Sequence, residues 1–223
     1  MSTTNGCLPT FYRHKNDIAF RKVEKDDLPE LLELKNESWF GTVQTACLNS
    51  TDQEKWFEKI AGDKSCMYFI AVDVKKGDAI GVFAITGIDP INQSCDFSHS
   101  IYASYRGKGL GKMSLRAGID MTFEMFNMRR IETWILDNNK AEAKSVRNVG
   151  FVEEGCKRQA VYKCGEYLDC RLYGLLRSEW DKSPEVKALR SQTYQNYALN
   201  TPVETVGVCN LSYRPKNFDS GKI

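Results

Sequence analysis

The 223-residue sequence predicts a fold of the α/β (α+β) class, and three observations support this prediction. Short apolar runs alternate with stretches of helical periodicity over residues 17–180. Two pairs of apolar runs are separated by four-residue polar turns, which is typical of β-hairpins. A glycine-rich turn at residues 106–111 connects an apolar run directly to a helical stretch. The length is enough for one well-buried domain, whereas two domains would be small.

The first elements are a strand and two helices. Residues 17–23 form a short extended run, and two aspartates after it supply the acidic first turn of a leucine-rich helix. Residues 39–50 show neither helical nor strand periodicity and are expected to be irregular. A second helix is expected over residues 52–61, with Thr51 or Asp52 as its N-cap.

The central part of the chain predicts a hairpin and the strand that leads into the glycine-rich turn. Residues 66–74 and 79–88 are apolar and β-prone, and a polar turn separates them. Residues 95–103 form the next strand. After the glycine-rich turn, charged residues recur every four positions while apolar residues occupy another face, which predicts an amphipathic helix.

The last elements are a strand over residues 131–136, a short helix over residues 139–148, and a hairpin with arms at 152–162 and 167–176. Gly150 follows the helix, where a left-handed C-terminal cap favours glycine. These elements complete the predicted domain.

Three segments are expected: an N-terminal extension (1–16), the domain (17–180) and a C-terminal extension (181–223). The C-terminal extension is polar and contains three prolines. It either docks through its apolar side chains, which would also allow a homo-oligomer, or forms a loosely ordered tail. Those side chains are Leu189, Tyr194, Tyr197, Leu199, Val203, Val206 and Val208.

The composition argues against several classes of function. A net charge of +2 predicts no strong field, so nucleic acid is not an expected partner. No run approaches 18 apolar residues and the N-terminus is polar, so no membrane contact is predicted and the protein is expected to be cytoplasmic. The eight cysteines include no Cys-x-x-Cys pair, which predicts free thiols and no metal site.

The glycine-rich turn is a candidate cradle for a pyrophosphate. Glycines let a backbone approach a diphosphate closely, and the first turn of a helix offers unpaired N–H groups and a partial positive charge. Lys108 and Lys112 add cations beside it. The alternative is a tight strand-to-helix turn with no ligand. Met113 excludes a nucleoside-triphosphatase phosphate loop, and only part of a dinucleotide-binding fingerprint is present.

Two segments together resemble the GNAT superfamily of acetyl-CoA-dependent N-acetyltransferases. Arg106, Gly109 and Gly111 fit its first motif, which is Arg or Gln, two residues, Gly, one residue, and Gly or Ala. Residues 139–151 form the companion segment. The stretch that follows looks like the RimJ/RimL-type branch, which acetylates ribosomal-protein N-termini and whose relatives acetylate polyamines, aminoglycosides and free amino acids. The resemblance covers residues 18–180.

The resemblance implies a mixed, mostly antiparallel sheet of six or seven strands, flanked by helices and splayed near the glycine-rich turn. Coenzyme A enters this splay in the family, so acetyl-CoA is the expected cofactor. The implied contacts are the backbone of Ile101, Tyr102 and Ala103 for the pantetheine arm, Arg106, Gly107, Lys108, Gly109, Leu110, Gly111 and Lys112 for the pyrophosphate, and Asn139.

Acetyl transfer to an amine requires the neutral amine, so a carboxylate or a histidine must accept a proton, often through water. Asp96 stands where this branch often has Glu and is the first candidate for the base, with an exposed sheet-edge carboxylate as the alternative. Asp169 matches the family's hairpin Asp, whose other role is to bond backbone. Glu37 is a candidate binder of a cationic amine. His99 is expected on the opposite face of the strand, as a hydrogen-bonded structural histidine.

The sequence also departs from the family pattern. Val146 replaces the Tyr that protonates the thiolate in many members, although a thiolate of pKa about 8.5 can leave without it. Glu142 and Val161 replace a Ser and a Glu of the ribosomal-protein enzymes, and Glu142 joins Asp96 and Asp169 as a candidate catalytic residue. The leading hypothesis is an N-acetyltransferase acting on a protein N-terminus, a polyamine or another small amine by direct attack. The alternative is a weak or inactive GNAT-fold protein that binds CoA or serves in assembly.

Overall fold

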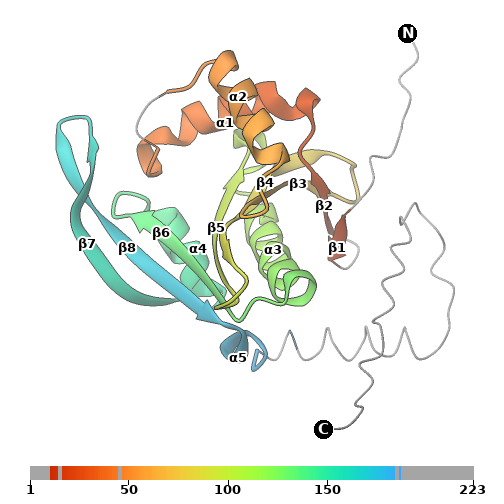
Figure 1. The fold of residues 1–223 in the computed structure, drawn as a ribbon, viewed down its shortest axis with the longest axis vertical. Helices are drawn as coiled ribbons and strands as arrows, with labels where there is room; N and C mark the ends of the chain where they lie inside the picture. Colours follow the sequence, from red (N-terminus) through yellow and green to blue (C-terminus); the bar gives the residue numbers. More distant parts are fainter. Residues whose placement is uncertain (1–10, 15–16, 45–46, 184–185, 187–223) are drawn as a thin grey trace, which may run out of the picture.

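The computed structural model describes residues 11–14, 17–44, 47–183 and 186, and it confirms the predicted α+β class (Figure 1). One sheet has the strand order β1-β2-β3-β4-β5-β6-β8-β7. All neighbouring strands pair antiparallel except β5 and β6, which pair parallel. Helices cover both faces of the sheet.

The strands are β1 Tyr12–His14, β2 Ile18–Lys22, β3 Met67–Asp73, β4 Ala79–Asp89, β5 Ser94–Ile101, β6 Arg130–Leu136, β7 Val152–Lys163 and β8 Glu166–Leu176. The helices are α1 Leu28–Ser38, α2 Ser50–Ala61, α3 Leu110–Phe126, α4 Lys140–Asn148 and α5 Arg177–Trp180, with short 3-10 turns η1 Lys25–Asp27, η2 Trp39–Gly41 and η3 Ala103–Tyr105. The eighth strand is β1, which lies in the predicted N-terminal extension and pairs with β2 at the edge of the sheet.

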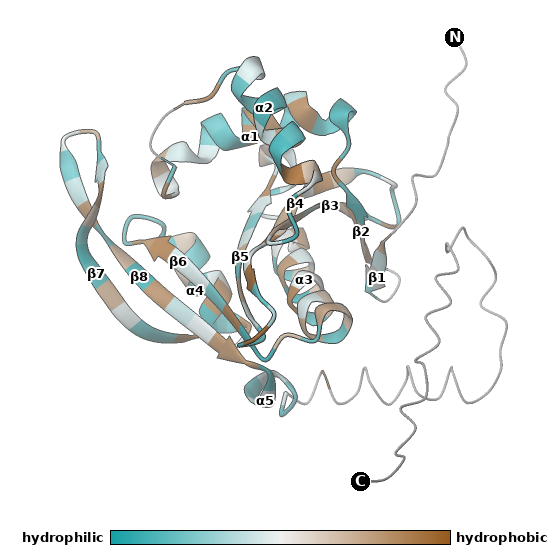
Figure 2. Cartoon of the chain, in the orientation of Figure 1, coloured by the Kyte–Doolittle hydropathy of each residue, from teal (hydrophilic) through white to brown (hydrophobic). Residues whose placement is uncertain are grey.

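The core lies mainly between the sheet and α3. Side chains alternate along each strand, so Phe20, Phe69 and Phe83 face α3, where Leu115 and Ile119 are fully buried. On the opposite face α1 packs through three leucines at helical spacing, Leu28, Leu31 and Leu34. Figure 2 shows the hydrophobic residues gathered on the central strands and α3, with the outward surfaces of α1 and α2 largely hydrophilic.

Two helix ends test the predicted caps. The predicted N-cap of α2 was wrong, because Asn49 occupies that position and its side chain accepts a hydrogen bond from the Asp52 N–H at 3.0 Å. Asp52 instead reaches back to the Asn49 N–H at 3.1 Å, which completes a capping box. Gly150 follows α4 with a φ of 108°, as predicted for a left-handed position.

The start of the C-terminal extension packs on the domain. Val186 is buried in the same hydrophobic core as Trp180, and Arg116 donates to the Ser183 hydroxyl at 3.2 Å. The apolar residues predicted to dock farther along lie outside the described part of the chain. Of the cysteines, Cys7 and Cys209 also lie outside it, and the six that are described are free thiols. Within the described residues, no helix is both long and apolar enough to cross a membrane.

Candidate active site

The sheet opens between β5 and β6, as predicted. Ser94–Asp96 pairs with Arg130–Glu132, and there the pairing ends. Beyond it β5 stays with β4 as far as Ile101, while β6 stays with β8 as far as Leu136. The peptide groups that face this splay therefore have no partner strand across it. In Figure 1 the two strands diverge toward the end where α1 crosses the sheet.

The glycine-rich turn lies where β5 ends and α3 begins. Gly107 and Gly109 have φ values of 74° and 79°, which favour glycine. A Cβ at either position would meet no other atom within 4 Å, so the backbone conformation requires these glycines and the space above them stays open. Gly109 is the N-cap of α3 and provides no side-chain cap, so the N–H groups of the first turn are available to an anion.

Two cations near the turn are engaged within the protein. The Arg106 Nε donates to the Ile101 carbonyl at 3.0 Å, and its guanidinium lies 3.5 Å from the Glu37 carboxylate. The Lys108 ammonium donates to the Ser104 carbonyl at 2.7 Å. These bonds hold the shape of the turn. Lys112 is exposed in the first turn of α3, where its charge adds to the positive electrostatic potential at the start of the helix.

Asn139 lies at the opposite side of the splay, where α4 begins. Its Oδ1 accepts a hydrogen bond from the Glu142 N–H at 3.2 Å, and its Nδ2 donates to the Gly41 carbonyl at 3.1 Å. The side chain therefore caps α4 and holds η2 near the splay. Asn138 repeats this contact by donating to the Phe40 carbonyl at 3.0 Å.

Lys163 adds a third tie to the segment after α1. It is 2% exposed, and its ammonium donates to the carbonyls of Trp39, at 2.7 Å, and Gln44. The ammonium also lies 4.5 Å from the centre of the Trp39 ring. Residues 39–44, expected to be irregular, are thus fixed to α4 and the β7–β8 hairpin. This role of Lys163 was not predicted, because its neighbours in the sequence are typical of a polar turn.

Asp96 is the last β5 residue that pairs across to β6, at the vertex of the splay. It is half-buried and lies opposite Glu132, and both burial and the Glu132 charge raise the pKa of its carboxyl above the ordinary value. Arg130 binds Glu132 at 2.5 Å and also binds Glu154. Glu132 was missed because a parallel register between distant strands leaves no local sequence signal.

His99 points to the opposite face from Asp96, as expected, because the β4–β5 register runs without interruption between them. Its ring lies 6.3 Å from the ring of Phe83. The expected hydrogen bond was wrong for one nitrogen, since the buried Nε2 has no hydrogen-bond partner among the described residues. Burial lowers the pKa of His99 to about 4, so the ring is neutral at physiological pH.

The two other candidate carboxylates differ in setting. Burial in the first turn of α4 raises the pKa of Glu142 to about 7. Asp169 instead braces β7, where its carboxylate accepts from the Gln159 N–H at 2.8 Å and from the Cys156 thiol at 3.6 Å. This is the backbone-binding role that the sequence left open. Val146, in the place of the family's tyrosine, is fully buried in the core.

Comparison with known proteins identifies the family. The family model described as an acetyltransferase (GNAT) domain matches residues 17–152. The chain belongs to the GNAT acetyltransferase family. It is 25% identical over 171 residues to the spermidine N(1)-acetyltransferase of Vibrio cholerae, covering 74% of this chain and 96% of that protein. It is 30% identical over 100 residues to the ribosomal-protein-serine acetyltransferase of Escherichia coli, covering 44% and 55% of the two chains.

A solved GNAT structure shares the fold. Spermidine N-acetyltransferase from Vibrio cholerae, in complex with CoA and spermine, matches with a TM-score of 0.67 at 23% identity, over 74% of this chain and 98% of that chain. Family membership makes the chain an N-acetyltransferase, an acyltransferase whose cofactor is acetyl-CoA. The open glycine-rich turn and the splay fit that cofactor, because one offers free amides to phosphates and the other offers unpaired strand edges to a chain of amides.

Proposed function

We propose that this GNAT enzyme acetylates a primary amine, either of a polyamine or of a protein N-terminus, by direct attack on acetyl-CoA with Asp96 as the base. The observation that carries the proposal is the position of Asp96 at the vertex of the splay, beside Glu132. The names of two relatives, one acting on spermidine and one on a ribosomal-protein serine, supply the two acceptor classes.

The cofactor would be held by this chain at two places. The amides from Gly107 to Lys112 would bind the pyrophosphate, and the backbone from Ile101 to Ala103 would bind the pantetheine arm. When bound, acetyl-CoA supplies the acetyl thioester. The free N–H groups of β5 that face the splay would donate to the thioester oxygen, which strengthens its polarisation.

Asp96 and Glu132 would draw a cationic amine to the vertex, and Asp96 would then take its proton. Neighbouring negative charge and burial raise the pKa of Asp96, which makes it a stronger base than an exposed aspartate. An α-amine with a pKa of about 7.7 to 8 yields its proton more readily than an amine near 10.4. Glu142, with a pKa of about 7, is the candidate for returning a proton to the departing sulfur, in the absence of a tyrosine at position 146. Asp169 would keep the β7 wall in position.

Release of CoA in the presence of a panel of amines tests the proposal. The panel contains spermidine, putrescine and peptides that begin with serine. Asp96→Asn should lower kcat by about 100-fold or more, because general bases contribute roughly 10²–10⁴. Glu58→Gln, an exposed carboxylate on α2, is the charge-matched control and should leave kcat unchanged. Binding of acetyl-CoA without turnover of any amine would instead favour the CoA-binding assembly protein.

The pH profile separates a base from a structural carboxylate. Glu132→Gln removes the like charge that raises the pKa of Asp96, while Arg130 keeps its partner Glu154. The acid limb of kcat/KM should therefore move to lower pH in this variant. An acid limb that does not move would exclude Asp96 as the titrating base.

A further inference from the structure

The face of the sheet that carries Asp96 continues across β6, β8 and β7. Asp96 pairs with Glu132, and Trp134 follows Glu132 by two residues, so the three side chains lie on one face. Two residues of a strand span roughly 7 Å. A molecule whose amine lies at the vertex of the splay can therefore reach Trp134, whose side chain is half-buried, with its next few atoms.

The opposite direction along β6 is filled by an ion-pair group. Arg130 precedes Glu132 by two residues and binds both Glu132 and Glu154. These side chains lie over Gly174 of β8, where an added Cβ would come within 2.6 Å of Glu154 and 2.7 Å of Arg130. An acceptor at the vertex therefore extends toward Trp134.

A cation stands over Trp134. The Lys157 ammonium lies 4.0 Å from the centre of the Trp134 ring. Lys157 pairs with Cys170 of β8, which pairs in turn with Leu136 of β6, so strand register puts the lysine on the same face as Trp134. Its side chain reaches back across β8 to the ring. The vertex thus carries two carboxylates, and the position next to it carries a positive charge.

Lys157 differs from the other cations of this face in its contacts. Strand register puts Arg130 and Lys163 on the same face, where Arg130 binds two carboxylates and Lys163 binds the carbonyls of residues 39–44. Lys157 is exposed, and among the described residues no carboxylate lies within ion-pair distance of its ammonium. A cation–π contact at an exposed site is weak, so the ammonium remains available to an anion.

The two acceptor classes differ at this position. A polyamine would put a second ammonium beside Lys157, and like charges repel. An extended peptide would put the side chain of its second residue there, because one residue spans roughly 3.3–3.6 Å and the side chain covers the remaining distance. A carboxylate on that side chain would pair with Lys157 while the α-amine pairs with Asp96 and Glu132. The face is therefore complementary to an acceptor that is positive at its amine and negative one residue farther on.

We propose that the acceptor is a polypeptide N-terminus with an acidic second residue, and that Lys157 selects it. The proposal rests on the proposed function, because it takes the vertex at Asp96 as the position of the amine. The carboxylate of the second residue would accept hydrogen bonds from the Lys157 ammonium, and the apolar stem of that side chain would lie against the Trp134 ring. A polyamine is disfavoured at the same place.

Calorimetric titration of the CoA-bound full chain with amidated pentapeptides tests this proposal. The peptides begin with Ser-Asp, Ser-Gly or Ser-Lys and are otherwise identical, and CoA in place of acetyl-CoA prevents turnover. The wild type should bind the Ser-Asp peptide roughly fivefold more tightly than the Ser-Lys peptide, the size expected for an exposed ion pair. Spermidine should bind more weakly than the Ser-Asp peptide.

Variants of Lys157 separate its charge from its structural contacts. Lys157→Glu should reverse the order, so that the Ser-Lys peptide binds more tightly than the Ser-Asp peptide, whereas Lys157→Arg should keep the wild-type order. The Ser-Gly peptide should bind all three proteins within about threefold, because salt screens charges that are not in contact. Lys76→Glu makes the same change of charge at an exposed lysine of the β3–β4 turn and should leave the order unchanged.

The proposal is overturned if the wild type binds no peptide, if it binds the Ser-Asp and Ser-Lys peptides equally, or if Lys157→Glu keeps the wild-type order. Release of CoA from acetyl-CoA is measured separately. Faster turnover of spermidine than of the Ser-Asp peptide would also overturn this proposal while leaving the proposed function intact. Tighter binding of the Ser-Asp peptide without turnover of any amine would support selection by Lys157 and contradict the proposed function.

Discussion

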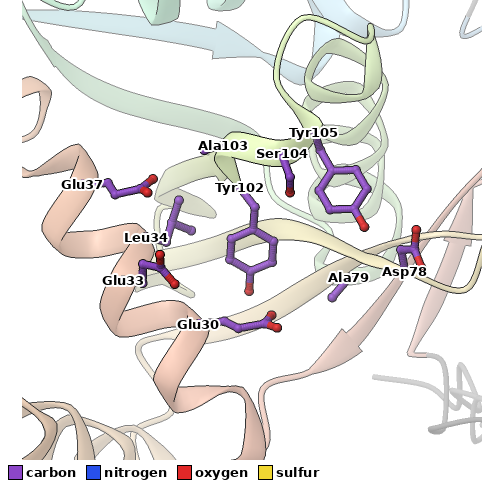
Figure 3. Close-up of a pocket in the computed structure, with 10 residues that line it drawn as sticks. All are labelled: Glu30, Glu33, Leu34, Glu37, Asp78, Ala79, Tyr102, Ala103, Ser104 and Tyr105. Carbon is purple, nitrogen blue, oxygen red and sulfur yellow. The ribbon is translucent and has the colours of Figure 1, made fainter.

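The two sides of the Arg106 segment differ in how they recognise charge. On one side the glycine-rich turn offers backbone N–H groups to an anion, and positive φ at Gly107 and Gly109 keeps side chains away. On the other side, a pocket of about 510 Å³ on the α1 face of the sheet is lined by carboxylates, and its walls come from three separate segments (Figure 3). The Glu37–Arg106 ion pair lies between them. A backbone site is therefore encoded in a few adjacent residues, whereas a side-chain site depends on how the elements pack.

A charged side chain in the glycine-rich turn should have the strongest effect on cofactor binding. Gly109→Glu should weaken acetyl-CoA binding by more than about 100-fold, because it puts bulk and negative charge into the open turn. Gly109→Ala is the control for strain, since its left-handed φ costs about 1–2 kcal/mol of stability without a charge. Calorimetry with acetyl-CoA separates the two. Equal losses in both variants would mean that backbone strain, rather than the phosphate site, controls binding.

Loss of the hydrogen bonds that Lys163 donates to residues 39–44 should give the next largest effect. Lys163→Met leaves the carbonyls of Trp39 and Gln44 without their buried donor, so we expect a loss of about 1–3 kcal/mol in the free energy of unfolding. The same loosening should raise KM for the amine more than it lowers acetyl-CoA affinity. Lys76→Met, at an exposed lysine of the β3–β4 turn, is the matched control. An unfolding free energy equal to that of the wild type would show that these hydrogen bonds do not stabilise the fold.

Glu142 predicts a pH-dependent effect on stability. Its pKa is raised to about 7 in the fold from an ordinary 4.5, so its neutral form favours folding fully below pH 4.5, and this contribution is lost as pH rises toward 7. Glu142→Gln should therefore raise the unfolding free energy by about 1–2 kcal/mol at pH 8, and by less at pH 5. Denaturant unfolding at the two pH values measures this. An equal gain at both would exclude titration as the cause.

Loss of the Glu37–Arg106 ion pair should have only a small effect. Glu37→Gln removes an ion pair whose two side chains are 40% and 52% exposed, and such pairs contribute little to stability. Acetyl-CoA affinity should stay within twofold, because the Arg106 Nε still donates to the Ile101 carbonyl. Calorimetric titration with acetyl-CoA tests this. A large loss of acetyl-CoA affinity would show that Arg106 needs Glu37 to shape the turn.

Local signals accounted for most of the architecture. The strands, hairpins and helices follow from periodicity and turn residues, and Gly150 was placed correctly by its capping position. The N-cap of α2 was misplaced because Asn49 and Asp52 can each cap, and their mutual geometry decides which of them does. The short strand β1 was missed because three residues are too few to show the alternation that predicts a strand. Among the described residues it pairs with β2 alone.

The α+β class, the glycine-rich turn and the family resemblance could all be predicted from the sequence, since they depend on residues that are neighbours along the chain. Packing between elements that are distant in the sequence set the rest: Asp96 lies opposite Glu132, Lys163 holds residues 39–44, and Asn139 donates to the Gly41 carbonyl. It also decided the acidic pocket. The three leucines of α1 pack on the sheet and thereby bring the glutamates of α1 opposite Tyr102 and Asp78. These residues are far apart in the sequence, so no local pattern predicts that they lie together.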